Sequence, residues 1–139
     1  MALIRALSGS SGGGGFTETT LWSNSNPSAN FSADDYSLSD DFRNYTYLKF
    51  VSNLSTSNTT KTYCIISVED FLKCDRTLYA NTYPLAWTGG CVGGYTYARY
   101  SAFFSANGYQ KIFFHNAYAV TNSAVSNGYI IPVEIIGLK

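Results

Sequence analysis

The side chains that could carry out chemistry are few and widely separated along the chain. The only histidine is His115, in the stretch FFHNAYAV. Nucleophilic catalysis would require this imidazole beside a serine or cysteine and an orienting carboxylate, but no nucleophile motif supports that arrangement. A zinc site of Cys64, Cys74, Cys91 and His115 would require ligands closely paired in tight turns, which this spacing does not offer. We therefore expect a half-buried structural histidine, no catalytic residue and no metal site.

The acidic pairs Asp34–Asp35, Asp40–Asp41 and Glu69–Asp70 are weaker candidates. Two carboxylates can hydrolyse a glycosidic bond when they flank a groove, and the loop DDYSLSDD offers oxygen ligands that suit calcium. Short loops do not build a glycosidase groove, however, and the spacing of a calcium-binding loop is absent. Solvated turn residues are the preferred interpretation, and no cofactor is expected.

Aromatic side chains are the best candidates for binding a ligand. In the stretch YTYARYSAFF, strand alternation places Tyr95, Tyr97 and Arg99 on one face and Tyr100 and Phe104 on the other. One face must enter the core, so the other packs against a partner subunit or is exposed. Exposed tyrosine rings are amphipathic and lose little entropy on contact with protein or sugar.

Trp87 lies in LAWTGG, beside a glycine-rich stretch, and is a second candidate platform. Such rings most often pack in a core or a subunit interface, and an exposed ligand-binding surface is the alternative for the same residues. The residues assigned to this surface are Trp87, Tyr95, Tyr97 and Arg99.

Composition limits both the size and the partners of the protein. Its 139 residues suffice for one domain, with no net charge and only 13% charged residues. A neutral surface argues against nucleic acid as a partner, and no apolar run reaches the ~18 residues of a membrane helix. The odd number of cysteines, without CxxC spacing, favours small, buried, reduced side chains, with a Cys64–Cys74 disulfide as the alternative.

Apolar residues recur mainly with a period of two, which predicts strands, and helical spacing is almost absent. Asn107-Gly108 and Asn127-Gly128 predict tight turns. About seven to nine short strands predict an all-β, antiparallel sandwich or jelly-roll-like domain. The expected strands include residues 16–22, 31–42, 45–52, 62–68, 95–105, 111–120 and 129–139, with a helical turn near 69–76 and a glycine-rich connection at 88–94.

The last expected strand, YIIPVEIIGLK, is apolar on both faces. The second face is also apolar, because it carries Ile130, Pro132 and Ile136. An antiparallel sheet with one solvent-exposed face needs apolar residues on only one face. Pro132 cannot donate to a ladder, so it belongs at an edge or a bulge. We predict that these three residues contact a neighbouring subunit, with a strand between two sheets as the alternative.

The N-terminus predicts a tether that holds the folded domain away from another object. Residues 9–15 contain only serine and glycine, which behave as a flexible linker, although an engineered scar is the alternative. We expect an anchoring peptide at residues 1–8, the linker at 9–15 and one domain at 16–139. The side chains expected to hold the anchor are Leu3, Ile4, Arg5 and Leu7.

Several stretches together resemble a known group of proteins: TTLWSNSNPSANF, NYTYLKFV, CIISVEDF and the ending IPxxIxGxK. That ending consists here of Ile131, Pro132, Ile135, Gly137 and Lys139. The chain from Thr19 onward is similar to small virion appendage proteins of tailed phages and prophages of Firmicutes, and to the head domains of their tail fibres. These motifs are structural, so they carry over no catalytic residues.

The resemblance implies a virion protein made in the host cytoplasm, assembled as a homo-oligomer, commonly a trimer, and anchored to other virion proteins by its N-terminus. Two functions are then open. The first is a tail-fibre or receptor-binding component that attaches to a host-surface carbohydrate. The alternative is a capsid decoration or head-fibre protein held on the capsid by residues 1–8.

Overall fold

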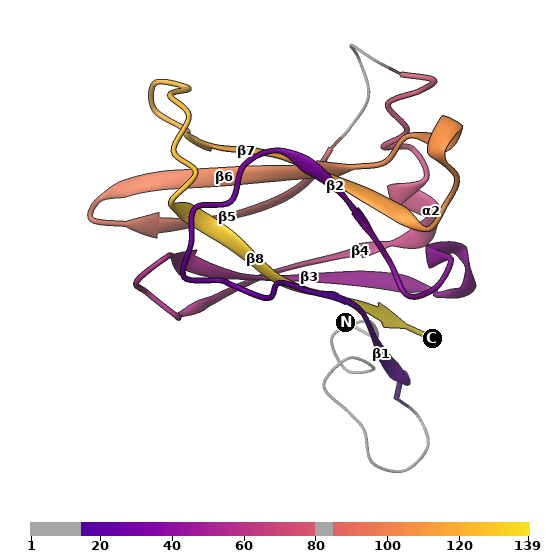
Figure 1. Ribbon diagram of the computed structural model, residues 1–139. Coiled ribbons are helices and arrows are strands. Elements are labelled where there is room, and N and C mark those ends of the chain that lie inside the picture. Colours follow the sequence, from indigo (N-terminus) through magenta and orange to yellow (C-terminus); the bar gives the residue numbers. More distant parts are fainter. Residues whose placement is uncertain (1–14, 80–84) are drawn as a thin grey trace.

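The computed structural model describes residues 15–79 and 85–139, which form two antiparallel β-sheets packed face to face (Figure 1). The all-β sandwich expected from the sequence is therefore confirmed. The proposed anchor residues Leu3, Ile4, Arg5 and Leu7 lie outside the described residues, so their role stays a prediction.

Each sheet contains four strands. Sheet I has the order β1-β8-β3-β4, and sheet II has the order β2-β7-β6-β5. The strands are β1 (Glu18–Ser23), β2 (Asp34–Ser37), β3 (Tyr47–Ser55), β4 (Lys61–Ser67), β5 (Ala86–Val92), β6 (Tyr95–Ala102), β7 (Lys111–Ala119) and β8 (Tyr129–Leu138). Between them lie the short helix α2 (Val68–Phe71) and the 3-10 turns η1 (Phe42–Asn44) and η2 (Ser105–Asn107).

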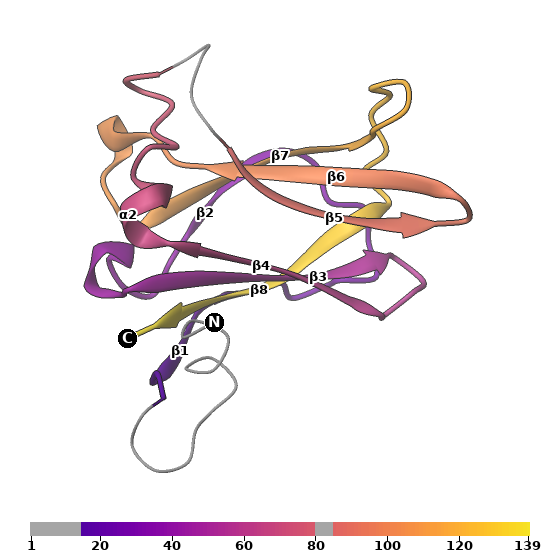
Figure 2. The same ribbon diagram turned by 180° about the vertical axis from the view of Figure 1, so that it is seen from behind.

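Pairings between distant strands close the sandwich. β1 pairs with β8 and β2 pairs with β7, so the beginning of the domain lies beside its end, whereas β3–β4, β5–β6 and β6–β7 join consecutive strands. Nested long-range pairs of this kind are the jelly-roll-like part of the topology. On the opposite side, β4 and β5 are the outermost strands of the two sheets (Figure 2).

Alternating apolar side chains explain why these strands pack as a sandwich. Leu48 and Phe50 of β3 point between the sheets, and Ile135 of β8 is paired with Phe50 on the same face. Phe42 of η1 and Phe71 of α2 meet edge to face there, with ring centroids 5.4 Å apart. Burying each such side chain contributes roughly 1.5–3 kcal/mol. The two short helical turns therefore close one end of the same core.

The position predicted for the glycine-rich connection, residues 88–94, is wrong. Gly89 and Gly90 lie within β5, and the turn to β6 is made by Gly93 and Gly94 alone. Their φ angles of 59° and 82° belong to the left-handed region that a two-residue hairpin turn requires. The strand therefore runs on to Val92, past the glycines that suggested a loop.

β8 is an inner strand of sheet I, between β1 and β3, so two of the three residues assigned to a subunit interface are corrected. Ile130 is fully buried, and its side chain lies near Gly90 of the opposite sheet. Pro132 is also buried, at the register shift between β3 and β8, which confirms the expected bulge. Its missing N–H costs no ladder bond at that position, and its carbonyl accepts a hydrogen bond from Asn24 Nδ2 at 2.8 Å.

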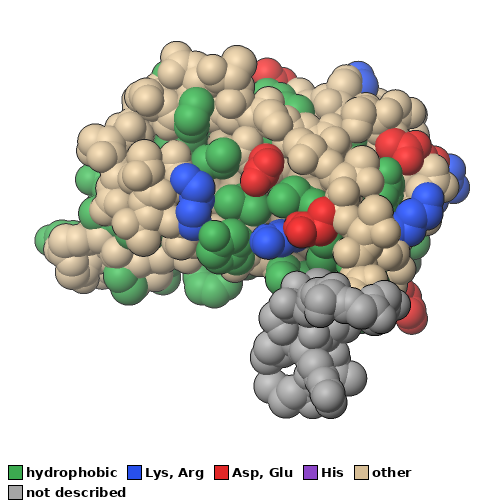
Figure 3. All heavy atoms as spheres, turned by 90° about the horizontal axis from the view of Figure 1, so that it is seen from below, with side chains coloured by type: hydrophobic (Ala, Val, Ile, Leu, Met, Phe, Trp, Pro, Cys, Tyr) green, Lys and Arg blue, Asp and Glu red, His purple; other side chains and the backbone are tan. Residues whose placement is uncertain are grey.

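Ile136, the third of these residues, lies on the outer face of sheet I. It is 9% exposed and packs in a small apolar cluster with Val51, Leu138, Phe16 and Tyr47. Figure 3 looks onto this face, where hydrophobic side chains lie among lysines and acidic residues. The last strand is therefore apolar on both faces because one face packs in the core and the other packs in this outer cluster.

Candidate functional site

The candidate binding face of β6 is the reverse of the one expected. Arg99 is only 1% exposed and points between the sheets, where its guanidinium lies over the ring of Phe31 at 5.1 Å. Its Nε and Nη1 each donate at 2.7 Å, to the carbonyls of Ile130 and His115, and Nη2 donates at 3.2 Å to that of Tyr129. Burial lowers the pKa of Arg99 to about 10, which leaves it charged at neutral pH. Arg99 is a structural residue and is removed from the ligand-binding surface.

Tyr97 and Tyr95 lie on the same strand face as Arg99, but the two rings differ in burial and in contacts. Tyr97 is half-buried and stacks on Tyr129, with parallel rings whose centroids are 3.9 Å apart. Tyr95 lies next to the Gly93–Gly94 turn and is 57% exposed. Tyr97 is therefore occupied by an intramolecular contact, and Tyr95 is an isolated exposed ring at the tip of the hairpin.

Trp87 lies on the outer face of sheet II and is 48% exposed. It is directly opposite Tyr100 in the β5–β6 pair, so the two rings share that face. The six-membered ring of Trp87 lies over Gly89, where a Cβ atom would be 2.7 Å from Cζ2 of the indole. Because Gly89 has no side chain, the indole can lie along the strand.

A groove of about 250 Å³ opens beside these rings, and we call it the aromatic groove. Tyr100, Ala98 and Tyr118 line it, and Ala98 is paired with Tyr118 across β6 and β7. Ala119 and, from the β7–β8 connection, Val120 and Ser123 also line it. Two phenol rings with an adjacent indole form a surface suited to stacking on a flat, partly apolar ligand.

His115 lies on the same outer face, towards the other end of β7. Its ring meets Phe113 edge to face, with centroids 4.8 Å apart, and Nε2 is 2.9 Å from Nη1 of Arg76. Burial and the positive charge of Arg76 both lower the pKa of His115, so the neutral imidazole accepts the hydrogen bond from the guanidinium. His115 is half-buried, as expected, and the partner of its Nε2 is a cation instead of the carboxylate that orients a catalytic base.

Strict alternation along β7 would place Ala117 on the same face as His115. Ala117 is instead paired with Arg99 and is buried on the inner side. β7 has an extra residue between Phe114 and Ala117, opposite Tyr100, and this bulge changes the alternation of the strand.

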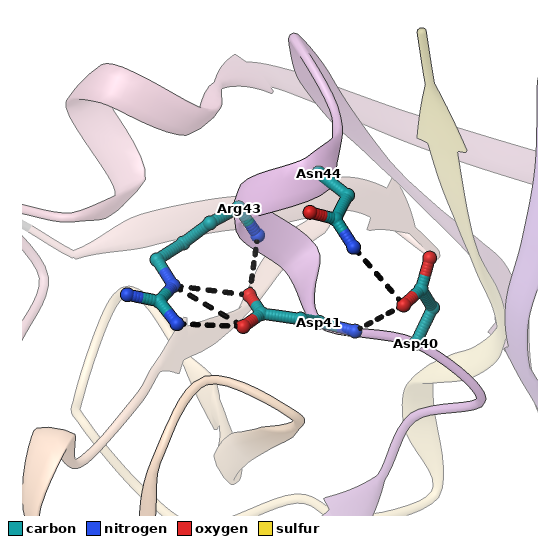
Figure 4. A network of polar contacts seen from close by, with 4 residues as sticks. All are labelled: Asp40, Asp41, Arg43 and Asn44. Atoms are coloured by element: carbon teal, nitrogen blue, oxygen red, sulfur yellow. Dashed lines mark hydrogen bonds and ion pairs between the residues drawn. The ribbon is translucent and has the colours of Figure 1, made fainter.

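The acidic pair Asp40–Asp41 holds a turn (Figure 4). Asp41 caps η1 by accepting a hydrogen bond from the Arg43 amide at 2.8 Å, and it forms an ion pair with Arg43 at 2.7 Å. The ion pair holds the pKa of Asp41 below its ordinary value. Asp40 accepts hydrogen bonds from Asn44 Nδ2 and the Tyr45 hydroxyl at 3.1 and 3.0 Å. These carboxylates therefore order the entrance to β3 and are more than solvated turn residues.

All three cysteines are free thiols. Cys74 is buried and Cys64 half-buried, as expected, and burial raises the pKa of Cys74 to about 11. Cys91 is exposed, contrary to expectation, because it lies near the end of the edge strand β5, with Sγ 3.2 Å from Thr96 Oγ1. Within residues 15–79 and 85–139 no three histidine, cysteine or acidic side chains gather as a metal site would require.

Two sequence comparisons with known proteins found no match. No protein-family model matches the chain. No curated protein is significantly similar to it in sequence. None of the helices in the described part of the chain is long and apolar enough to cross a membrane. The arrangement of side chains on the outer face of sheet II is therefore the main guide to function.

The sequence predicted an exposed ring at Trp87, which the structure shows, but its neighbours Gly89, Tyr100 and Tyr118 were not assigned to the candidate surface. The available signal was the turn: residues equally far from Gly93 and Gly94 are paired in a two-residue hairpin, which places Trp87 opposite Tyr100. The position of Tyr118 could not be predicted in this way. It depends on the bulge in β7, and the alternation of residues along β7 does not reveal that bulge.

Proposed function

We propose that the protein is a non-enzymatic attachment head of a phage virion appendage, which binds a host-surface saccharide in the aromatic groove. The observation that carries the proposal is the half-exposed indole of Trp87, held over Gly89 and opposite Tyr100. Support for the virion assignment comes from the sequence resemblance, and support for binding comes from the groove.

The chemistry of the groove favours a neutral sugar. Pyranose rings have apolar C–H faces that stack on aromatic rings and hydroxyl groups that bond to phenols and serine hydroxyls. The described residues that line the groove include Tyr100, Tyr118 and Ser123 and no charged side chain. A single shallow groove of this kind binds weakly, with a Kd of about 1 mM, and several heads in one oligomer gain strength by avidity.

The test is binding of the full chain to cell-wall polysaccharide extracted from the host, measured for Trp87→Ala and for a matched variant. Tyr79→Ala is that control, because Tyr79 is an exposed aromatic residue, at 50%, outside both sheets. Loss of the stacking ring is expected to weaken binding about tenfold, whereas Tyr79→Ala binds as the wild type does. A wild-type protein that binds neither host cells nor their polysaccharide would contradict the proposal.

A capsid decoration or head-fibre protein is the second candidate, and the outer face of sheet I favours it. Beside the cluster around Ile136, Tyr63 and Ile65 are 58% and 37% exposed, which leaves apolar surface for contact with another protein. Immunogold labelling with antibodies against residues 16–139 distinguishes the candidates, because gold on the tail supports the attachment head and gold over the capsid supports decoration. Deletion of residues 1–8 is expected to abolish incorporation in either case.

A further inference from the structure

A second depression, of about 300 Å³, lies at the connection between β1 and β2. One wall consists of Trp22, Phe31 and Tyr36. The ring centroids of Trp22 and Tyr36 are 5.0 Å apart, and those of Phe31 and Tyr36 are also 5.0 Å apart, nearly parallel. Phe31 is backed in turn by the buried guanidinium of Arg99. This wall is therefore fixed before any ligand arrives, so binding costs little side-chain entropy.

The rest of the depression is rich in amides, and we call it the asparagine hollow. Asn24 is fixed, because Nδ2 donates to the Pro132 carbonyl at 2.8 Å and Oδ1 accepts from the Asn26 amide at 2.9 Å. Asn26 and Asn30 are exposed at the rim. In the described parts of the chain no hydrogen bond is formed by either of their side-chain amides. These amides can each donate to and accept from a ligand.

The lining of the asparagine hollow selects for the charge of its ligand. Its described residues are aromatic, serine, alanine and asparagine side chains without a formal charge. Burial and the nearby carboxylate of Asp34 raise the pKa of Tyr36, so its hydroxyl stays protonated and can donate a hydrogen bond. A stacking wall with amides and a phenol at its rim matches a neutral pyranoside that carries hydroxyl or acetamido groups.

The hollow and the aromatic groove border the same connection between β7 and β8. Val120 and Ser123, at its beginning, line the groove. At its end, the Asn127 carbonyl accepts a hydrogen bond from the Phe31 amide at 3.0 Å, and Asn30 Oδ1 lies close to Gly128. Both depressions therefore adjoin the β7–β8 connection, the groove at its beginning and the hollow at its end.

From this geometry we infer that the asparagine hollow is a second saccharide subsite, which binds a neutral pyranoside through the Trp22–Tyr36 wall and the amides of Asn26 and Asn30. The inference rests on the proposed function, since it adds a second point of attachment to the same head. Two weak subsites in one head would hold two residues or two branches of a surface glycan.

The two tryptophans make the subsites separately observable. The chain has only Trp22 and Trp87, one in the hollow and one beside the groove, so two indole N–H signals in an NMR titration report on the two places. The probes are chitotetraose, which carries acetamido groups, and maltotetraose, which does not. We expect saturable shifts of Trp22 and of the side-chain amides of Asn26 and Asn30 with at least one probe.

Variants connect the shifts to the amides. The double variant Asn26→Ala, Asn30→Ala removes two exposed amides and is expected to weaken binding at Trp22 about tenfold while leaving the Trp87 titration unchanged. Asn107→Ala, at an exposed asparagine in η2, is the matched control and should change neither titration.

The outcomes separate this inference from the function on which it rests. Shifts at Trp87 alone would overturn the second subsite and leave the attachment head intact. Shifts at Trp22 that persist in the double variant would also overturn it, because the amides would then take no part. No saturable shift at Trp22 with either probe would overturn the subsite, whereas the saccharide-binding function is overturned separately, by a wild-type protein that does not bind the host polysaccharide.

Discussion

At the scale of single residues, the cation Arg99 is buried, and no carboxylate of residues 15–79 and 85–139 forms an ion pair with it. Arg99 is held by the carbonyl oxygens of three residues that come from β7 and the beginning of β8. It also supports Ile130, whose φ of 45° lies in a region that β-branched residues rarely adopt. The guanidinium therefore fixes the strand ends next to both proposed subsites.

Arg99→Met is expected to lower the free energy of unfolding by about 2–4 kcal/mol, because it leaves buried carbonyl oxygens without donors. Urea denaturation measures this loss. Arg43→Met is the control, since Arg43 is exposed, and it should change stability little. Equal stability of the two variants would contradict the structural role of Arg99.

His115 predicts a dependence of stability on pH. Its pKa in the folded protein is below the ordinary 6.5, so the unfolded chain binds the proton more tightly. The free energy of unfolding therefore falls as the pH drops below 6.5, and it stops falling once the folded imidazole is also protonated. Thermal unfolding of the wild type and of His115→Gln between about pH 7 and about pH 5 checks this. The same loss of stability in both proteins would show that another group is responsible.

At the scale of elements, the β5–β6 hairpin builds the aromatic groove. Its two-residue turn sets the register that places Trp87 opposite Tyr100, and Gly89 leaves room for the indole. A glycine inside a strand ordinarily weakens the pairing of that strand, but Gly89 here leaves the space that the Trp87 indole occupies.

Gly89→Ala is expected to displace the indole, because the new Cβ would lie 2.7 Å from Cζ2 of Trp87 and 2.8 Å from the carbonyl oxygen of Tyr97. The Trp87 indole N–H signal should move, the Trp22 signal should not, and saccharide binding should weaken about tenfold. Circular dichroism verifies that the variant is folded. A folded variant with an unmoved Trp87 signal and full binding would refute this role for Gly89.

The elements also show what the sequence could and could not predict. Period-two alternation predicted most strands and the sandwich, because apolar side chains on one face of a strand must be buried. Alternation alone cannot tell which face is inside when both carry tyrosines, so Arg99 was assigned to the surface although it lies in the core. The bulge in β7 and the place of β8 between β1 and β3 depend on pairing partners far along the chain. Trp87 was expected to be exposed, and it is exposed on the edge strand β5, whereas its role in binding stays a proposal.

At the scale of the whole molecule, the sandwich presents two different outer faces. Sheet II carries the aromatic groove, and sheet I carries the apolar cluster around Ile136 with Tyr63 and Ile65 beside it. This division suits a head that assembles through one sheet and binds through the other. Assembly as a homo-oligomer, proposed as a trimer, therefore belongs to sheet I in this account.

Ile65→Asp is expected to dissociate that oligomer, because it puts a charge into an apolar contact without disturbing the core of the subunit. Ile65 is a better choice than Ile136, which is only 9% exposed and whose replacement would also unfold the outer cluster. Light scattering measures the mass of both proteins. A wild-type protein that is already a monomer would contradict assembly through this face.

The most direct measurement of the central claim is adsorption competition, in which purified protein is added to host cells before the phage. An attachment head should occupy the receptor, so the wild type should reduce phage adsorption in a dose-dependent way, and Trp87→Ala should compete about tenfold less well. Tyr79→Ala, at an exposed tyrosine outside both sheets, should compete as the wild type does. Competition by Trp87→Ala equal to that of the wild type, or none by either protein, would contradict attachment through the aromatic groove.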